Sequence, residues 1–425
     1  MRKKVLIVTY YWPPAGGPGV QRWLKFVKYL PEFNIEPVVY IPSNPSYPIL
    51  DESLVNEIPK GAKIIKQPIL EPYKFAGLLS QKKSKTISKG IIPKKKSQTL
   101  LDKLLLFVRG NLFIPDARKN WVKPSVSYLS AYMKNFKIDT IITTGPPHSL
   151  HLIGLELQKS NNINWIADFR DPWTTIGYHK QLMLTKRSQK KHKALEKAVL
   201  QSANQVIVTS RTTKREFAEI TDKPIQVITN GYDVLPTVKN DLDTKFSIAH
   251  IGSLLSDRNP EVLWRVLSNL IKSNSDFARD FQLRFVGFVS DDILNSIKKY
   301  NLIDYLNNVG YVSHKQAIEY QYTSQILLLI EIDSKETRCI IPGKLFEYLV
   351  SNRPIVALGP EGSDVAEILK ETNTGKYFSY DDYDSLKQII LEYYKRYKEG
   401  DLESQGIGLK KYSRKALTKQ LTEIL

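Results

Sequence analysis

The sequence predicts an α/β protein with two Rossmann-like domains, and three observations support this expectation. Short apolar runs, typical of buried parallel strands, alternate with helical patterns from one end of the chain to the other. The length of 425 residues exceeds what one hydrophobic core usually supports. A polar stretch at 233–244, which contains Pro236, separates two series of these patterns.

The first series predicts an N-terminal domain over residues 1–235. It begins with an apolar strand at 4–10, and a loop rich in Pro and Gly follows at 13–19. The next segment has helical periodicity. Its apolar face is formed by Val20, Trp23, Leu24, Val27 and Leu30, and its opposite, basic face by Arg22, Lys25 and Lys28. Further strands are expected at 37–41, 62–65, 138–143, 164–168, 205–209 and 226–229.

The second series predicts a C-terminal domain over residues 236–405. Its strands are expected at 246–251, 282–286, 308–311, 326–332, 355–358 and 376–378. Its first helix is expected to bury the stripe Val262, Leu263, Val266, Leu267 and Leu270. The tail from 401 is basic and has a helical pattern, and its last part, 406–425, could pack back on the N-terminal domain.

The composition is that of a soluble globular protein, with 42% hydrophobic and 25% charged residues. The single cysteine, Cys339, excludes an intrachain disulfide, and the expected compartment is the reducing cytosol. No signal peptide is recognised. The longest apolar run, 326–330, is far below the ~20 residues that span a bilayer, so we expect a cytoplasmic protein, soluble or peripheral on the inner membrane face.

The net charge of +19 is concentrated in two segments. Residues 59–124 carry 16 Lys and Arg against 3 Asp and Glu, and residues 180–197 carry 7 against 1. A basic insertion is expected at 74–118, where a Lys/Ser-rich loop precedes an apolar stripe of Leu100, Leu101, Leu104, Leu105, Phe107 and Val108. This pattern suits a surface helix on an anionic membrane, and a helix packed on its own domain behind a solvated loop is the alternative.

Two clusters in the N-terminal domain follow predicted strands, at the edge where open α/β sheets bind ligands. Gly16 and Gly17 let a ligand approach the backbone closely, although a purely structural turn would need the same residues. His148 is a candidate catalytic residue, which could contact a sugar hydroxyl or a phosphate.

A third cluster, Asp168, Arg170 and Asp171, ends the strand at 164–168. Charged side chains at the end of a buried strand are costly unless they are functional or paired. The cluster is therefore a candidate catalytic region, and a structural Asp168–Arg170 ion pair is the alternative.

The C-terminal domain has a similar turn after its first strand, with Gly252, Ser253 and Arg258. A glycine-led turn that places an arginine near a helix N-terminus suits a diphosphate. The alternative makes Asp257 the N-cap of that helix and Arg258 its surface partner.

The segment 342–356 carries the most informative pattern. A Pro-Gly turn opens a short helix in which Lys344 and Glu347 lie one turn apart, with Gly343 at its start. Backbone N–H groups and a lysine can hold phosphate, and a carboxylate one turn further on can accept hydrogen bonds from sugar hydroxyls. An ordinary i,i+3 pair on a helix surface is the alternative.

Other patterns carry less chemistry. Asp382 and Asp384 match an Asp-x-Asp spacing but precede a helix, so capping is the expected role. His148 and His151 are three residues apart with no evident third ligand, which argues against a metal site. No Ser-His-Asp or Cys-His arrangement is recognised.

These segments resemble the family-4 (group 1) glycosyltransferases, whose GT-B architecture has two Rossmann-like domains facing across a cleft. The resemblance extends over nearly the whole chain, and the last of its segments is the most specific: YYWPPAGGPGVQRW, DFRDPW, ITNGYD, IGSL with DRNP, and PGKLFEYLVSNRPIV. It implies that Glu347 binds the donor's ribose, and that Lys344 and Arg258 neutralise its diphosphate.

The resemblance further implies retaining transfer of a sugar from a nucleotide diphosphate sugar to a hydroxyl of a glycan or lipid-linked acceptor, as in cell-surface polysaccharide synthesis. It implies no cofactor, no essential metal and no nucleic-acid partner. The sequence departs from the family pattern at three places. Cys339 stands where many members have a first glutamate, with Glu336 the nearest acid. Ser253 and Asn259 replace a usual Arg and Lys pair, and Asp168-Phe169-Arg170-Asp171 replaces a stretch that often has a histidine.

Two other functions fit parts of the pattern. A sugar-nucleotide epimerase of similar architecture would change the sugar nucleotide without an acceptor. A non-catalytic protein that binds membranes or nucleic acids would use the basic charge alone, but the chain has no recognised RNA or DNA motif and no stacking aromatics between its basic residues.

Overall fold

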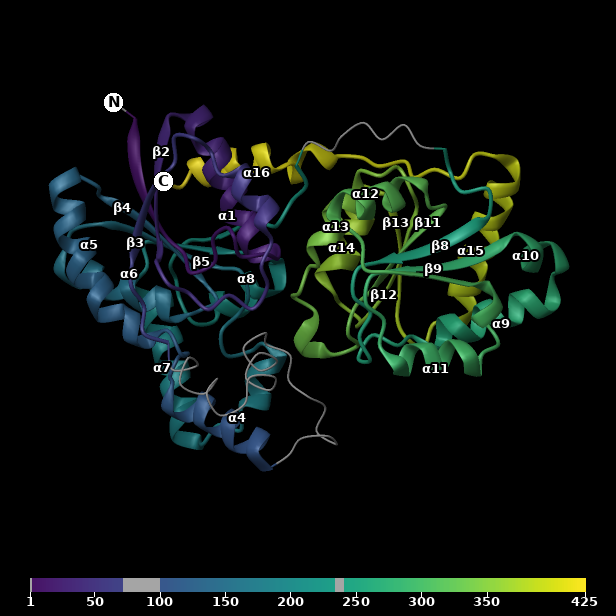
Figure 1. Ribbon diagram of the computed structural model, residues 1–425, viewed down its shortest axis with the longest axis horizontal. Coiled ribbons are helices and arrows are strands. Elements are labelled where there is room, and N and C mark those ends of the chain that lie inside the picture. Colours follow the sequence, from purple (N-terminus) through teal and green to yellow (C-terminus); the bar gives the residue numbers. More distant parts are fainter. Residues whose placement is uncertain (1, 72–99, 234–240) are drawn as a thin grey trace. The chain divides into compact units, whose positions relative to one another are not determined.

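A computed structural model describes residues 2–71, 100–233 and 241–425 of the chain. The chain divides into two compact units (Figure 1). Unit 1 comprises Met1–Asn230 and Arg414–Leu425, and unit 2 comprises Gly231–Ser413. The lysine-rich part of the expected insertion, 74–99, lies outside the described residues.

Unit 1 contains a seven-stranded parallel sheet with the order β3-β2-β1-β4-β5-β6-β7. Its strands are β1 (Lys3–Val8), β2 (Ile35–Pro42), β3 (Lys63–Gln67), β4 (Thr140–Gly145), β5 (Asn164–Phe169), β6 (Gln205–Val208) and β7 (Ile225–Val227). Each of them overlaps a run predicted from the sequence. The order reverses direction between β1 and β4, which creates the crevice where Rossmann-like sheets bind ligands.

Helices cover both faces of this sheet, as expected for buried parallel strands. The helices of unit 1 are α1 (Pro18–Tyr29), α4 (Leu100–Leu112), α5 (Val122–Phe136), α6 (Ser149–Ser160), α7 (Lys186–Ser202), α8 (Arg211–Ala218) and α16 (Arg414–Thr422). Alternate residues of β1 point to opposite faces. Val5 and Ile7 pack with α1 and α16, whereas Leu6 and Val8 pack with α5, α6 and α7. Short 3₁₀ helices lie at Leu30–Phe33, Glu52–Glu57, Lys119–Trp121 and Gly177–Leu182 (η5).

Unit 2 repeats this plan with a six-stranded parallel sheet of order β10-β9-β8-β11-β12-β13. Its strands are β8 (Phe246–Ile251), β9 (Phe281–Val286), β10 (Leu306–Gly310), β11 (Ile326–Ile330), β12 (Ile355–Leu358) and β13 (Gly375–Phe378). All six overlap predicted runs. Here the order reverses between β8 and β11.

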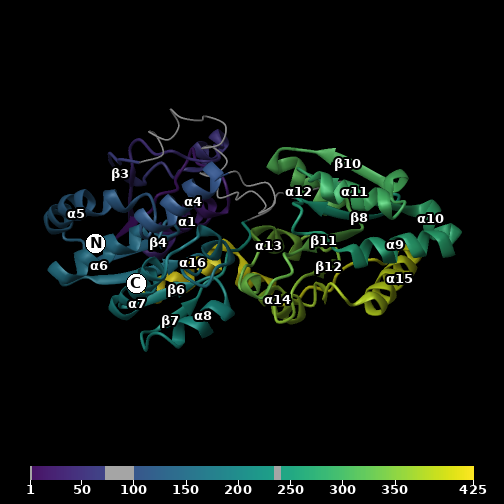
Figure 2. The same ribbon diagram turned by 90° about the horizontal axis from the view of Figure 1, so that it is seen from below.

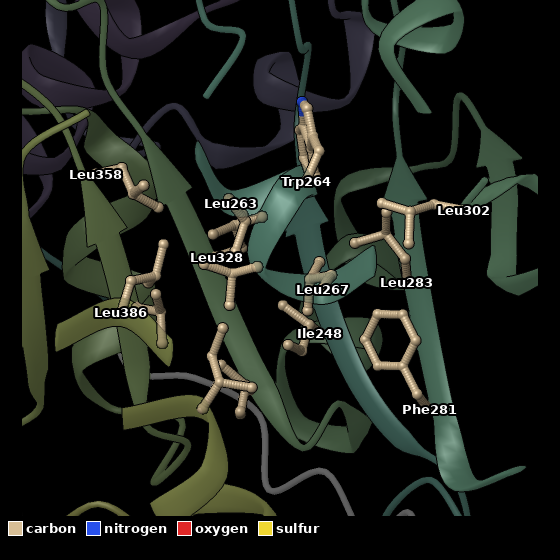
Figure 3. Close-up of a cluster of buried hydrophobic side chains, with 14 of the residues drawn as sticks. Ile248, Leu263, Trp264, Leu267, Phe281, Leu283, Leu302, Leu328, Leu358 and Leu386 are labelled. Carbon is tan, nitrogen blue, oxygen red and sulfur yellow. The ribbon is translucent and has the colours of Figure 1, made fainter. Parts of the chain in front are cut away.

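The helices of unit 2 form two layers around the sheet (Figure 2). They are α9 (Glu261–Ser273), α10 (Ser275–Asp280), α11 (Asp291–Lys299), α12 (His314–Thr323), α13 (Gly343–Leu349), α14 (Asp364–Thr372) and α15 (Tyr383–Glu399). Figure 3 shows one side of the core, where Leu263 and Leu267 of α9 pack on Ile248 and Leu328 of the central strands. The predicted apolar stripe of α9 is therefore confirmed, and α13 and α14 pack on the other face.

Two local predictions need correction. Arg22 was expected on the exposed face of α1, but its side chain is only 1% exposed, because it forms an ion pair inside the unit. The tail from 401 is only partly helical. Residues 401–407 form no helix, and a 3₁₀ turn at Leu409–Tyr412 precedes α16. Asp382, in contrast, caps α15 as predicted, since its side chain accepts a hydrogen bond from Ser385 N.

Among the described residues, no helix combines the length and the apolar character needed to cross a membrane.

Candidate functional site

The best-defined candidate site lies in unit 2, where the sheet order reverses. The recorded pairing of β8 with β11 ends at Ala249 and Leu327. Gly252 follows β8 with a φ of +118°, a conformation that favours glycine. A Cβ atom at this position would lie 2.5 Å from Lys344 Nζ. Glycine is therefore needed both for the turn and for the close approach of the lysine.

Lys344, in the first turn of α13, places its ammonium group against the backbone of Gly252. Its Nζ lies 3.3 Å from His250 Nε2. Burial and the nearby charge of Arg258 lower the pKa of Lys344 to about 7, although Glu347 acts in the opposite direction. The surroundings of Lys344 therefore disfavour its charged form when no anion is bound.

Arg258 supplies the second cation of this site. It belongs to the loop between β8 and α9, and its Nε is buried without a hydrogen-bond partner among the described residues. Asp257 does not cap α9, because the N-cap residue is Pro260. Within the described part of the chain, neither Arg258 nor Lys344 forms a salt bridge, although the charges of Glu347 and Lys344 and those of Glu331 and Arg258 interact at longer range.

Glu347 lies one helical turn after Lys344, but the two do not form the surface ion pair that was the alternative interpretation. The Glu347 carboxylate is paired instead with His314 Nε2 at 3.0 Å and Gln321 Nε2 at 2.9 Å. Both partners come from α12, so the packing of α12 against α13 fixes the direction of this side chain. Gly343 is the first residue of α13, a helix of only seven residues, and Ser253 is exposed beside Gly252.

Sequence reasoning missed two buried residues at this edge of the sheet, His250 and Glu331. Glu331 follows β11 and is 4% exposed; its Oε2 accepts hydrogen bonds from Ser363 Oγ and Tyr377 Oη at 2.8 and 2.7 Å. Burial raises the pKa of Glu331 to about 7. The position of Glu331, an acid directly after the apolar strand β11, was the sequence signal that could have identified it.

In unit 1, the predicted catalytic region contains a carboxylate that already accepts hydrogen bonds from three side chains. Asp168 is fully buried and accepts hydrogen bonds from Arg22 Nη2 at 2.9 Å, and from Trp23 Nε1 and Thr144 Oγ1 at 2.8 Å. Burial would raise the pKa of Asp168, but the charge and hydrogen bonds of Arg22 outweigh that effect and hold it below its usual value. The proposed Asp168–Arg170 pair is therefore wrong, and Asp168 is engaged in linking β5 to α1.

Arg170 turns the other way from Asp168. Its guanidinium donates to the carbonyl oxygens of Gly145 and Pro146 and lies 5.7 Å from the ring centre of Tyr11. A Cβ on Gly19 would lie 1.9 Å from Arg170 Nη1, so only glycine at this position lets the Arg170 side chain lie against the start of α1. Burial raises the pKa of the neighbouring Asp171 carboxyl. Arg170 and Asp171 thus remain the charged groups of this region that could face a ligand.

His148 lies in a group of buried histidines behind Arg170. Its ring stacks on Trp173 at 4.9 Å, and neither ring nitrogen has a hydrogen-bond partner among the described residues. Burial lowers the pKa of His148 well below its usual value and lowers that of His151 to about 3. The described residues contain no group of three or more His, Cys, Asp or Glu side chains that could hold a metal ion.

The two glycines predicted for donor binding differ in their surroundings. Gly16 donates its N–H to Ile49 O at 3.0 Å, and a Cβ there would lie 3.0 Å from the Ile49 side chain. Gly17 has a φ of +99° and open space around it. Both belong to unit 1, whereas the other donor-binding candidates belong to unit 2.

Comparison with known proteins agrees with the resemblance seen in the sequence. Residues 94–234 match the family model Glycosyltransferase Family 4. The chain resembles the family-4 glycosyltransferases. No curated protein matches the chain.

Solved structures share the GT-B glycosyltransferase fold over nearly the full length. A glycosyltransferase from Rickettsia africae is 13% identical with a TM-score of 0.63, covering 100% of this chain and 97% of the other. The Anabaena protein HepE, in complex with UDP-glucose, is 13% identical with a TM-score of 0.60, covering 99% and 98%. A structure described as a UDP-N-acetylglucosamine 2-epimerase from Listeria monocytogenes is 12% identical with a TM-score of 0.55, covering 99% and 95%. The family match supports assignment as a glycosyltransferase, and the solved structures show the fold.

The segment around Cys339 departs from the glycosyltransferase pattern. Cys339, at the position of the family's first glutamate, is 6% exposed. Glu336, the nearest acid in sequence, accepts hydrogen bonds from the Ser334 hydroxyl in a 3₁₀ turn at Lys335–Thr337.

Proposed function

We propose that the chain is a retaining glycosyltransferase. It transfers a sugar from a nucleotide diphosphate sugar to a hydroxyl of a glycan or lipid-linked acceptor in cell-surface polysaccharide synthesis. The observation that carries this proposal is the pair of cations Lys344 and Arg258 at the reversal point of the unit 2 sheet. Lys344 Nζ lies against Gly252, the charge of Arg258 acts on Lys344, and neither residue forms a salt bridge among the described residues.

The chemistry of transfer fits these side chains. When the bond between the anomeric carbon and the diphosphate breaks, negative charge develops on the leaving diphosphate. Lys344 and Arg258 would stabilise that charge, and Glu347 would accept hydrogen bonds from the ribose hydroxyls. No cofactor and no essential metal are part of this proposal.

The direct test incubates the protein with UDP-, GDP- and ADP-sugars, with and without alkyl glycosides as acceptor probes. Transfer predicts release of nucleoside diphosphate that depends on the acceptor, together with a longer glycoside whose anomeric configuration is that of the donor. The epimerase reading rests on the fold shared with the Listeria protein. It predicts a changed sugar nucleotide without any acceptor, and that result would overturn the proposal.

Replacement of Glu347 by alanine is expected to weaken nucleoside diphosphate binding by roughly 10- to 100-fold, because charge-assisted hydrogen bonds to the ribose are lost. Inorganic pyrophosphate has no ribose, so its affinity should change little. Calorimetry with both ligands checks this, and Glu392→Ala, which removes an exposed acid from α15, is the matched control. Equal weakening for both ligands, or no weakening, would contradict a ribose contact.

We further propose that the enzyme binds an anionic membrane surface through α4 and the start of α7. The exposed apolar side chains here are Leu104, Phe107, Leu112 and Met183, which are between 41% and 61% exposed. Asn111 of α4 donates to Met183 O and accepts from Thr185 N, so the four side chains share one region. The exposed basic residues of α7 follow directly: Lys186, Arg187, Lys190, Lys191 and Lys193. Apolar groups next to Lys and Arg suit anionic lipid.

The double variant Leu104→Asp/Phe107→Asp should bind vesicles of anionic phospholipid at least about tenfold more weakly, since it removes apolar burial and adds like charge to the lipid. Sedimentation with vesicles measures the effect, and neutral vesicles should bind weakly in every case. Ile407→Asp, at a site in unit 2 that is 60% exposed, provides the control. Unchanged binding of the double variant would exclude α4 as the lipid contact.

A further inference from the structure

The ring of His250 lies directly behind the phosphate-binding lysine. His250 is the penultimate residue of β8, two residues before Gly252, and is 1% exposed. Recorded pairing between β8 and β11 ends one residue earlier, at Ala249. Where the two strands separate, His250 Nδ1 contacts Leu328 O at 3.1 Å. The ring is therefore held between the strands beneath the candidate site.

These contacts determine the tautomer of His250. A carbonyl oxygen can only accept a hydrogen bond, so Nδ1 carries the proton and donates it to Leu328 O. Nε2 is then an acceptor, and Lys344 Nζ, 3.3 Å away, donates to it. Burial, together with the charges of Lys344 and Arg258, lowers the pKa of His250 well below its usual value, although backbone hydrogen bonds to Leu328 and Ser253 act in the opposite direction, so the ring is neutral at neutral pH.

The charged groups around Lys344 come from three elements. Arg258, in the loop after β8, disfavours the ammonium, and Glu347, on α13 itself, favours it. His250, on β8, is the only hydrogen-bond acceptor recorded for Nζ within the described residues. The imidazole thus holds one of the three Nζ hydrogens, and an incoming anion can accept the others.

We propose that His250 is a positioning residue for the donor's diphosphate: its neutral Nε2 fixes Lys344 Nζ against Gly252, and the pair takes up a proton when the diphosphate binds. This rests on the function proposed above. In the free protein, Lys344 is partly deprotonated near neutral pH. Bound diphosphate favours the ammonium, so binding draws a proton from solvent above about pH 7, and affinity falls as the pH rises further.

Two variants distinguish the two hydrogen bonds of the His250 side chain. In His250→Asn the amide nitrogen can replace Nδ1, but the acceptor for Lys344 is lost. In His250→Gln the amide oxygen can replace Nε2, but the donor to Leu328 is lost. We expect His250→Asn to bind UDP about tenfold more weakly than wild type, as for loss of a hydrogen bond to a charged group, and His250→Gln to bind nearly as wild type. Thermal unfolding controls for folding of both variants.

The deciding readout is proton uptake, which a merely structural histidine would not change. Calorimetry of UDP or inorganic pyrophosphate binding in buffers of different ionisation enthalpy should show uptake that begins near pH 7 in wild type. In His250→Asn the ammonium has lost its acceptor, so the pKa of free Lys344 falls and uptake begins at lower pH. Lys344→Met should abolish uptake. Identical uptake profiles in wild type and His250→Asn would overturn the proposal.

A measurement on the free protein separates this inference from the proposed function. In protein labelled with ¹³C at lysine Cε, the resonance that Lys344→Met removes should titrate near pH 7 in wild type and at lower pH in His250→Asn. An unchanged titration would refute the positioning role even if UDP binds. Absence of binding by UDP and pyrophosphate, with the expected shift present, would contradict the proposed function and the diphosphate ligand, and leave His250 as the partner of Lys344.

Discussion

Replacement of Asp168 by alanine is expected to lower the free energy of unfolding of unit 1 by about 3–5 kcal/mol, the usual cost of removing one partner of a buried ion pair. Arg22 is 1% exposed and would keep its charge without the carboxylate. Trp23 and Thr144 would lose their acceptor as well. The hydrogen bond that Arg22 donates to Thr229 O at 2.8 Å and its position over the Phe26 ring would remain, but they do not neutralise its charge.

Denaturant unfolding followed by tryptophan fluorescence measures this effect, because Trp12, Trp23, Trp121, Trp165 and Trp173 lie in unit 1 and only Trp264 lies in unit 2. Asp222→Ala, which removes an exposed acid from unit 1, is the matched control and should change stability little. A loss below about 1 kcal/mol for Asp168→Ala would show that the pair contributes little to the fold.

Replacement of Lys344 by alanine should reduce kcat/KM for transfer by roughly 100- to 1000-fold, as expected when one donor to a developing negative charge is removed from a preorganised site. Affinity for the nucleoside diphosphate product should fall by about tenfold or more, because the same ammonium contacts the ground-state phosphate. Stability should not fall, since the free protein holds this charge unfavourably.

Lys298→Ala removes an exposed lysine from α11 of the same unit and should leave both quantities unchanged. Steady-state kinetics with the active donor, and calorimetry with the matching diphosphate, provide the two readouts. Retention of wild-type kcat/KM by Lys344→Ala would place the diphosphate elsewhere in the molecule.

The central strands, such as β1, β4, β8, β11 and β12, were predictable because their residues are mostly buried on both faces and are mostly apolar. All thirteen described strands overlap expected runs, and β8 and β12 match them at both ends. Errors occurred where a charged residue broke the pattern. The periodicity of α1 assigns Arg22 to the polar face, and only the position of Asp168 at the end of β5 explains why it is buried.

The predicted residues of the unit 2 site were those with local signals. Gly252, Lys344 and Glu347 follow strand ends or open a helix, and such positions can be recognised in a short window of sequence. Their partners are distant in the chain. His250 meets Lys344 across 94 residues, and His314 meets Glu347 across 33, so only the order of the sheet brings them together.

The same limit applied to the catalytic region of unit 1. Asp168, Arg170 and Asp171 are nearly adjacent, which suggested that the first two pair with each other. Residues two apart in a strand share a face, but β5 ends at Phe169 and Arg170 lies beyond it, so the alternation no longer holds. Asp168 therefore faces α1, whereas Arg170 donates to the carbonyl oxygens of Gly145 and Pro146. Spacing along the chain therefore identified the region but not the partners.

We propose that unit 2 binds the diphosphate of a nucleotide sugar at Lys344 and Arg258. Calorimetric titration of the full chain with UDP, GDP, ADP and CMP, in the presence of EDTA, tests it most directly. We expect saturable binding of one nucleoside diphosphate without added metal, weakened at least about tenfold in Lys344→Ala. Absence of binding by all four nucleotides, or equal binding by Lys344→Ala, would contradict the account.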